Sequence, residues 1–260
     1  MNSFDTSSRD EQLLRMYLKR LGLPQRDPSL SYLNELINAH QHFIPFETHT
    51  RILDFHQHDG NLPSIETYIN RLSSGCGGVC WTLARGFKWL LENLGFSVCY
   101  LYMKPGHVCL AVKLDEVEWY ADVGYAAPFF EAKLLNQSFR VLSSSEEFDY
   151  QVNIDEVMVT RTPGPTKVLS LRSVSAEFLH SEFEAINVWE QNKFLKTLTY
   201  NRYFEGRLLR FTNDTVFDYR EGKMRERKLS YEEIEDFLRK DLGVDSDYYF
   251  QSSLLLTQPK

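Results

Sequence analysis

Three side chains of the kinds used in nucleophilic catalysis stand out in the sequence, and the first is Cys80. It follows the glycine-rich stretch Gly75-Cys76-Gly77-Gly78-Val79 and precedes apolar residues at helical spacing. The spacing predicts a helix that begins at Cys80 and stops at Gly95, a residue type favoured just past helix ends. Unpaired backbone N–H groups at a helix start favour thiolate over thiol and can hold an oxyanion. Because many cysteines are simply small buried apolar residues, the nucleophile hypothesis depends on partners.

The partners are His107 and Asp122. Residues 106–114 and 117–123 read as two strands. If Asp115-Glu116 is the two-residue tip of a hairpin, His107 lies diagonally across from Asp122 on the same face, within side-chain reach. A lone strand histidine is usually structural and an aspartate before Val-Gly usually marks a turn. Together, however, the three residues predict a triad of cysteine nucleophile, imidazole base and orienting carboxylate.

These motifs resemble those of a known family. Cys-Gly-Gly-Val-Cys-Trp (76–81), Gly-His-Val-Cys-Leu-Ala-Val (106–112) and Tyr-Ala-Asp-Val-Gly-Tyr (120–125) are similar, in order, to the cysteine, histidine and aspartate blocks of the arylamine N-acetyltransferases. Residues 33–47, which run into Ile-Pro-Phe-Glu, and Phe-Glu-Ala-Ile-Asn at 183–187 extend the likeness over most of the chain. The sequence therefore resembles a divergent member of that family.

The resemblance implies an α+β fold with a core like that of cysteine proteinases. Its expected parts are a helical bundle with the nucleophile (1–95), a β-barrel with the histidine and aspartate (96–182) and an α/β lid (183–260). The residue pattern agrees, because apolar periodicity changes from helical to strand-like at about Phe96. Helices are predicted at 11–21, 29–39, 65–72 and 231–242, the last with Ser230 and Glu233 as a capping box, and strands at 139–142, 157–161, 166–172, 208–212 and 216–219.

Several positions depart from the family pattern. Cys76 stands where a basic residue is usual, and Trp81, Thr82 and Ala84 replace the acidic motif that normally follows the nucleophile. Ala126 replaces a glycine, and Asn192-Lys193-Phe194 replaces a Ser-Pro-Phe pattern. Joint loss of a basic and an acidic residue removes an ion pair without stranding a buried charge.

The resemblance implies acyl transfer by double displacement. The Cys80 thiolate, formed with His107, would take the acetyl group of acetyl-CoA as a thioester and pass it to an arylamine, arylhydrazine or N-hydroxyarylamine, while Asp122 orients His107. The expected substrate-binding residues are Phe46, Trp81 and Tyr125, although a role in the core explains each equally well. The expected coenzyme A contacts are Gly124, Ala126 and Phe194.

Three alternatives remain open from the sequence. A cysteine hydrolase or transglutaminase-like enzyme uses the same triad with water or a lysine amine as acceptor. A member of the same family uses another acyl donor or a specialised metabolite. A non-catalytic relative serves as a binding protein, which the intact Cys80, His107 and Asp122 disfavour.

Composition and motif content limit the classes of partner, location and cofactor that we expect for this protein. With 260 residues and 43% hydrophobic content the chain is long enough for a substantial core. The net charge of −7 without a long basic stretch argues against nucleic acid or an anionic membrane as the partner. The sequence has no signal-peptide pattern, and we expect a cytoplasmic protein. Without paired Cys-x-x-Cys knuckles or a His-Glu-x-x-His helix, we expect no metal.

Overall fold

The N-terminal third of the chain is helical, as predicted. The computed structural model describes residues 3–143, 146–204 and 206–257. The helices of this part are α1 (Ser3–Leu21), α2 (Leu30–Phe43), α3 (His49–Gln57), α4 (Ile65–Leu72) and α5 (Cys80–Asn93). Among the described residues, no helix combines the length and the apolar character needed to cross a bilayer.

Helix α5 runs through the centre of the helical core. Leu83, Phe87 and Leu90 on α5 are fully buried against α1, α2 and α4. Gly95 ends the helix with φ +87°, the left-handed conformation predicted for it. The core therefore fixes the position of the first residue of α5, which is Cys80.

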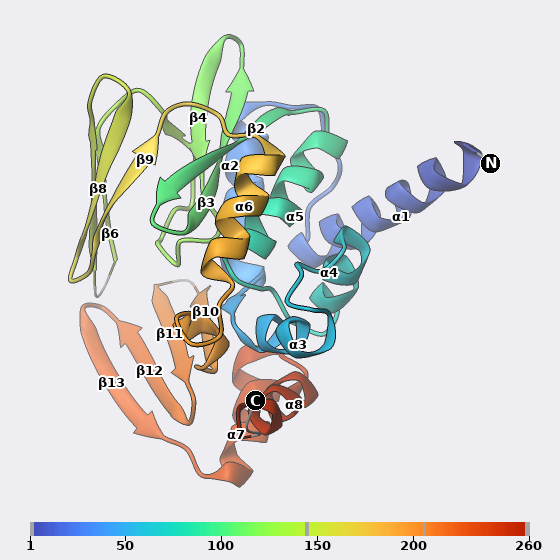
Figure 1. Ribbon diagram of the computed structural model, residues 1–260, viewed down its shortest axis with the longest axis vertical. Coiled ribbons are helices and arrows are strands. Elements are labelled where there is room, and N and C mark those ends of the chain that lie inside the picture. Colours follow the sequence, from blue (N-terminus) through green and yellow to red (C-terminus); the bar gives the residue numbers. More distant parts are fainter. Residues whose placement is uncertain (1–2, 144–145, 205, 258–260) are drawn as a thin grey trace.

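The middle of the chain forms an antiparallel sheet that curls into a nearly closed barrel (Figure 1). Its strand order is β5-β4-β3-β2-β9-β8-β7-β6. The bounds are β2 Ser97–Lys104, β3 His107–Leu114, β4 Val117–Ala121, β5 Lys133–Leu134, β6 Phe139–Leu142, β7 Glu147–Val152, β8 Glu156–Thr162 and β9 Thr166–Ser170. Tyr120 on β4 and Tyr150 on β7 meet across the interior with ring centroids 5.5 Å apart. This contact between distant strands confirms the barrel.

A second antiparallel sheet lies below the barrel in Figure 1, with the order β1-β10-β11-β12-β13. Its strands are β1 Phe46–Glu47, β10 Thr199–Phe204, β11 Arg207–Thr212, β12 Thr215–Arg220 and β13 Lys223–Lys228. The remaining helices are α6 Ala176–Ile186, the 3-10 turn η1 Lys193–Leu195, α7 Tyr231–Phe237, the π-helical turn η2 Leu238–Leu242 and α8 Ser246–Thr257. The predicted capping box of Ser230 and Glu233 begins α7.

The second sheet joins two distant parts of the chain. Phe46 of β1 pairs with Asn201 of β10, so a strand from the N-terminal segment completes a sheet built from the C-terminal one. The division of the chain at residues 95 and 182 stays a proposal, and strand β1 shows how closely its first and third parts are joined.

Candidate active site

Two glycines allow the chain to present Cys80. The backbone of the N-cap residue Val79 is extended, with φ −81° and ψ 169°. Just before it, Gly78 forms a bridge with Phe46, and its carbonyl accepts a hydrogen bond from the Glu47 N–H at 3.0 Å. A Cβ on Gly77 would lie 2.0 Å from the Pro45 carbonyl oxygen, so only glycine permits this approach. The glycine loop therefore packs directly against β1, and α5 begins at Cys80 immediately after it.

The hairpin has the predicted register. Asp115 and Glu116 both have positive φ, 48° and 63°, as a two-residue type I′ turn requires. Leu114 pairs with Val117, and the ladder continues to Leu110 and Ala121. This register places His107, the first residue of β3, on the same side as Asp122, which follows the last residue of β4.

His107 and Asp122 form a buried pair. His107 Nε2 lies 2.7 Å from Asp122 Oδ2, and the two residues are 3% and 2% exposed. A carboxylate only accepts hydrogen bonds, so Nε2 carries the proton and Nδ1 is the ring nitrogen left to interact with the thiol. Asp122 also accepts from Tyr120 Oη at 2.6 Å, from Gly124 N at 2.8 Å and from Tyr125 N at 3.1 Å.

The charges of this pair reinforce one another. Burial by itself lowers the pKa of His107, but the charge of Asp122 and hydrogen bonds with Asp122 and Cys80 outweigh it and raise the pKa to about 9. Burial raises the pKa of Asp122, whereas the His107 charge and the hydrogen bonds from His107, Tyr120 and Gly124 together lower it below its usual value. At neutral pH the site therefore holds an imidazolium beside a carboxylate.

Cys80 lies directly beside this pair. Its Sγ is 3.9 Å from the Gly106 carbonyl oxygen, which also accepts from Trp81 Nε1 at 3.3 Å. On the other side, a Cβ on Gly124 would lie 2.7 Å from Cys80 Cα. The loop after Asp122 therefore packs against the nucleophile itself, and the three predicted catalytic residues meet in one place.

A cavity of about 440 Å³ opens onto the triad. Cys80 and His107 line it, and so do most of the predicted ligand contacts, namely Phe46, Gly124, Tyr125, Ala126 and Phe194. Phe46 and Phe194 meet edge to face with centroids 5.7 Å apart, and the Tyr125 ring lies 4.6 Å from the His107 ring. The cavity can therefore hold a flat apolar group next to the thiol.

The charged side chains that line this cavity are all basic apart from the triad: Arg161, Lys167, Lys193 and Arg210. Sequence reasoning missed Arg161, Lys167 and Arg210, because β8, β9 and β11 lie far apart in the chain and carry no local motif. Lys193 lies in the Asn192-Lys193-Phe194 segment that the sequence analysis singled out. Tyr120 was also missed, although strand alternation places it on the same face as Asp122 and so gave a signal.

Three residues in and beside the triad are also of the types that bind metal ions. His107, Cys109 and Asp122 offer ligand atoms within 4.8 Å of one another. Both Asp122 oxygens, however, already accept hydrogen bonds from His107, Tyr120, Gly124 and Tyr125. Burial raises the pKa of the Cys109 thiol well above its usual value, and metal ligation needs the thiolate. This donor set fits a metal poorly, and the absence of a metal stays a prediction.

Comparison with known proteins decides the family. The sequence model of the N-acetyltransferase family matches residues 29–248, most of the chain. The chain belongs to the arylamine N-acetyltransferase family. One curated relative, proansamycin X synthase of Amycolatopsis mediterranei, is 28% identical over 142 residues, 50% of this chain and 52% of that protein. The chain thus matches about half the length of this relative.

Solved arylamine N-acetyltransferases share the fold. The enzyme from Salmonella typhimurium superposes with a TM-score of 0.77 at 19% identity, over 93% of this chain and 98% of the other. The Mycobacterium marinum arylamine N-acetyltransferase in complex with CoA gives a TM-score of 0.74 at 18% identity, over 92% and 94% of the two chains. The predicted α+β architecture with a cysteine-proteinase-like core is confirmed.

Two departures from the arylamine N-acetyltransferase pattern have structural consequences. Ala126 has φ +55°, a left-handed conformation that explains why glycine is usual there. Cys76 is 1% exposed, and burial raises the pKa of its thiol far above the usual value. Cys76 therefore fills space behind the glycine loop and does not line the catalytic cavity.

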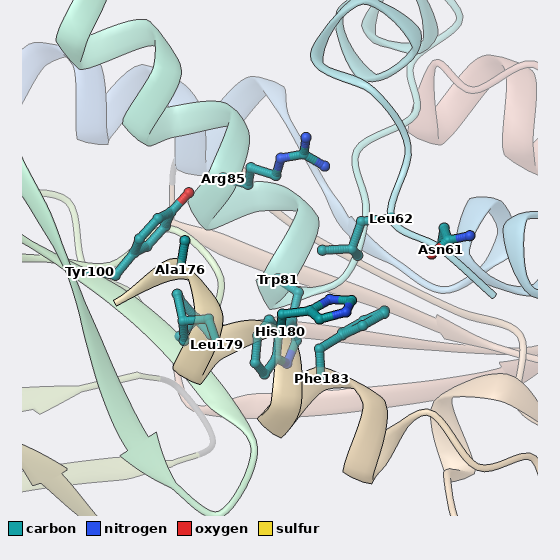
Figure 2. A pocket seen from close by; sticks show the side chains of 10 residues that line it. Asn61, Leu62, Trp81, Arg85, Tyr100, Ala176, Leu179, His180 and Phe183 are labelled. Atoms are coloured by element: carbon teal, nitrogen blue, oxygen red, sulfur yellow. The ribbon is translucent and has the colours of Figure 1, made fainter. Parts of the chain in front are cut away.

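Trp81 is not among the residues that line the catalytic cavity. It lines a second cavity of about 300 Å³ between α5, α6 and the segment before α4, where Figure 2 shows it among Leu62, Leu179 and Phe183. Its assignment as a substrate contact stays a prediction, and the geometry gives it a different role, since Trp81 Nε1 holds the Gly106 carbonyl beside Cys80.

Proposed function

We propose that this protein transfers an acetyl group from acetyl-CoA, through a thioester on Cys80, to an aromatic amine or hydrazine. The observation that carries the proposal is the placement of Cys80 at the start of α5, beside the buried His107–Asp122 pair and at the wall of a 440 Å³ cavity. Nucleophile, base and orienting carboxylate are the three parts that covalent acyl transfer needs.

In the first half-reaction the Cys80 thiolate attacks the thioester carbonyl carbon. The carbonyl oxygen becomes an oxyanion that the free N–H groups at the start of α5 would stabilise. As the intermediate collapses, the carbon–sulfur bond to coenzyme A breaks and the leaving sulfur takes the proton of the His107 imidazolium. Acetyl-cysteine and neutral His107 remain.

In the second half-reaction the neutral amine nitrogen attacks acetyl-cysteine. The amine proton passes to His107, the bond from carbon to Cys80 sulfur breaks, and the amide product leaves. Thiolate and imidazolium are restored. Asp122 favours each step that charges His107, because it is a buried anion 2.7 Å from the ring.

Two observations support the substrates. The basic residues Arg161, Lys167, Lys193 and Arg210 at the cavity suit a donor that carries phosphates, and a family member of the same fold is known in complex with CoA. The rings of Phe46, Tyr125 and Phe194 suit a flat aromatic acceptor. We place the reaction in the cytoplasm, where acetyl-CoA is available.

The direct test is the intact mass of the protein after brief exposure to acetyl-CoA without an amine. We expect one acetyl adduct that peptide mapping places on Cys80 and that an added arylamine removes. Cys80→Ala should give no adduct, whereas Cys99→Ser, at a half-buried thiol on β2, should keep it. An unmodified Cys80 that iodoacetamide still alkylates contradicts acetyl-CoA as donor, and an unreactive Cys80 contradicts catalysis.

A second candidate keeps the mechanism and changes the substrate. The curated relative is named as the synthase of one product, proansamycin X, so the family includes a protein named for a specialised product. An acyl-enzyme that forms from other acyl thioesters and not from acetyl-CoA favours this candidate.

A further inference from the structure

The second cavity, of about 300 Å³, is a separate space next to the nucleophile. Trp81 of α5 and Phe183 of α6 meet at its wall, with ring centroids 5.3 Å apart. Trp81 Nε1 donates at 3.3 Å to the carbonyl of Gly106, a residue that lines the catalytic cavity. Among the described residues, the two cavities have no lining residue in common. A ligand in the second cavity would therefore leave the catalytic cavity open.

Most of the side chains that line the second cavity are apolar or aromatic (Figure 2). They are Leu62, Trp81, Val108, Ala176, Leu179 and Phe183. An apolar cavity of about 150 Å³ can hold a benzene molecule, and this one has about twice that volume. It therefore has room for one aromatic ring that carries a short chain, and its apolar walls are typical of small-molecule sites.

One guanidinium group, that of Arg85, lines this apolar space. Its Nη1 donates to the Pro63 carbonyl at 2.9 Å, and no carboxylate in the described part of the chain pairs with it. Since a guanidinium has five N–H donors, most of them are available to a ligand. His180 also lines the cavity, but its ring is exposed and lies 3.3 Å from Glu184. Arg85 is therefore the cation that a ligand in this cavity would meet.

A tyrosine hydroxyl lies near Arg85. Tyr100 of β2 lines the same cavity, and Figure 2 shows its hydroxyl end turned toward the part of α5 that carries Arg85. Burial raises the pKa of Tyr100 above its usual value, although the charge of Arg85 acts in the opposite direction. The hydroxyl is therefore protonated at neutral pH and can donate a hydrogen bond. A carboxylate that accepts from both residues would form charge-assisted hydrogen bonds.

We propose that the second cavity is a binding site for a small aromatic carboxylate, with the ring against Trp81 and Phe183 and the carboxylate at Arg85 and Tyr100. Trp81 and Arg85 are four residues apart on α5, so they lie on one face of the helix and about 6 Å apart along its axis. A chain of two carbons between ring and carboxylate spans a similar distance. The inference goes beyond the proposed function and needs no reaction at Cys80.

The chemistry of the walls favours a carboxylate over other ligands. One guanidinium matches the single charge of a carboxylate, whereas a phosphate group carries up to two negative charges, and the second would stay uncompensated in an apolar space. A neutral aromatic compound would cover the Arg85 donors without accepting from them, which is costly.

The test is a titration of ¹⁵N-labelled protein with 3-phenylpropionate and with the neutral 3-phenylpropionamide, followed by NMR through the indole N–H signals of the four tryptophans. We expect the carboxylate to shift the signal of Trp81, which Trp81→Phe identifies. Its affinity should be roughly 10- to 100-fold higher than that of the amide, the effect of a hydrogen-bonded charge. Arg85→Gln should bring the two affinities close together, and Tyr100→Phe should reduce their ratio by a smaller factor.

Two further variants are the controls. Arg210→Gln removes the same charge from the catalytic cavity, so the preference for the carboxylate should persist. Arg85→Lys keeps the charge and should retain part of the preference, which a general folding defect at this position would not do.

Several outcomes would overturn the proposal. A Trp81 signal that neither compound moves means that the cavity takes up no such ligand. Equal affinities in the wild type, or a preference that Arg85→Gln leaves unchanged, rule out Arg85 as the group that binds the carboxylate. A preference that is lost in Arg210→Gln and kept in Arg85→Gln places the ligand in the catalytic cavity instead. None of these outcomes affects the formation of acetyl-cysteine, which is tested separately.

Discussion

The charge state of the triad rests on His107 and Asp122, which are almost fully buried. Removing two charges from water is costly, and the pair persists because Tyr120 Oη and two backbone N–H groups complete the hydrogen bonding of Asp122. The protonation states of His107 and Asp122 therefore affect both catalysis and the stability of the fold.

Stability should fall as the pH rises from about 6.5 to 9. The pKa of His107 is raised to about 9 in the folded protein, against about 6.5 in an unfolded chain. A raised histidine pKa contributes stability that is fully present below the unfolded value and is lost as pH rises through the folded one. The expected loss is on the order of 3 kcal/mol, measured by urea unfolding at several pH values.

The control for this prediction is an exposed histidine. His107→Gln should be less stable than the wild type near pH 6 and should lose this pH dependence, whereas His180→Gln, on the surface of α6, should retain it. Identical slopes in the wild type and in His107→Gln would contradict the assigned protonation state.

Gly124 has to be small because its backbone packs against Cys80. An alanine Cβ would lie 2.7 Å from Cys80 Cα, a backbone atom that cannot move freely. Gly124→Ala should displace the nucleophile and slow formation of acetyl-cysteine by roughly 100-fold, the cost of a misplacement of about 1 Å. Quenched-flow mass spectrometry measures this rate.

Gly22→Ala is the matched control for Gly124→Ala. Gly22 has φ +69° and no neighbour within 4 Å of a new Cβ. The variant should lose about 1 kcal/mol of stability through backbone strain and keep the acylation rate. Normal acylation by Gly124→Ala would show that this loop does not fix Cys80.

At the scale of elements, the sequence predicted those that carry their own signals. Helix α5 has helical apolar spacing and a glycine stop, α4 has the predicted bounds, and the β3–β4 hairpin has a two-residue tip. The helix α8 was not predicted, because its apolar residues show no single helical face. Strand β13 (Lys223–Lys228) is exposed throughout, so no burial pattern marks it, and only its pairing with β12 makes it a strand.

The β3–β4 turn should accept glycine with a gain in stability. Glu116 has φ +63°, which costs a non-glycine residue roughly 1–2 kcal/mol. Glu116→Gly should raise the free energy of unfolding by about 1 kcal/mol, after the larger unfolded-state entropy of glycine is subtracted. Thermal melts and retained acylation would check both the stability and the register.

A glycine at position 118, two residues after Glu116, should instead lower the free energy of unfolding. Glu118 lies within β4 and pairs with Lys113, so Glu118→Gly should lower stability by roughly 0.5–1 kcal/mol. If both glycine variants are destabilised alike, the turn does not have the type I′ geometry that sets the register of His107 and Asp122.

At the scale of the whole molecule, the catalytic cavity is assembled from parts that no local pattern connects. The triad could be predicted because Cys80, His107 and Asp122 lie in one continuous segment of the chain and each stands in a recognisable motif. Arg161 and Arg210 could not, because they meet at Glu146 only after β8 of the barrel and β11 of the second sheet come together. Predicting such a pair requires the tertiary contact itself.

The N-terminal and C-terminal segments are joined through Thr48. Its N–H donates to the Thr199 carbonyl at 3.0 Å, its hydroxyl donates to the Thr197 carbonyl at 2.6 Å, and the same hydroxyl accepts from Thr199 N at 2.8 Å. Arg202 ties the same region together, donating to the carbonyls of His42 at 2.7 Å and Leu242 at 2.8 Å. Separating the segments would break all of these hydrogen bonds.

The chain should therefore unfold in one transition although it is built around two sheets. Calorimetry should give a van't Hoff enthalpy equal to the calorimetric one, and Thr48→Val should lower the free energy of unfolding by about 2 kcal/mol, the loss of two hydrogen bonds, while the transition stays single. Thr257→Val, at an exposed hydroxyl near the end of α8, should change little. Two resolved transitions in the wild type would show instead that the C-terminal sheet folds on its own, so that Phe46 and Phe194 reach the same cavity wall only by docking of separate units.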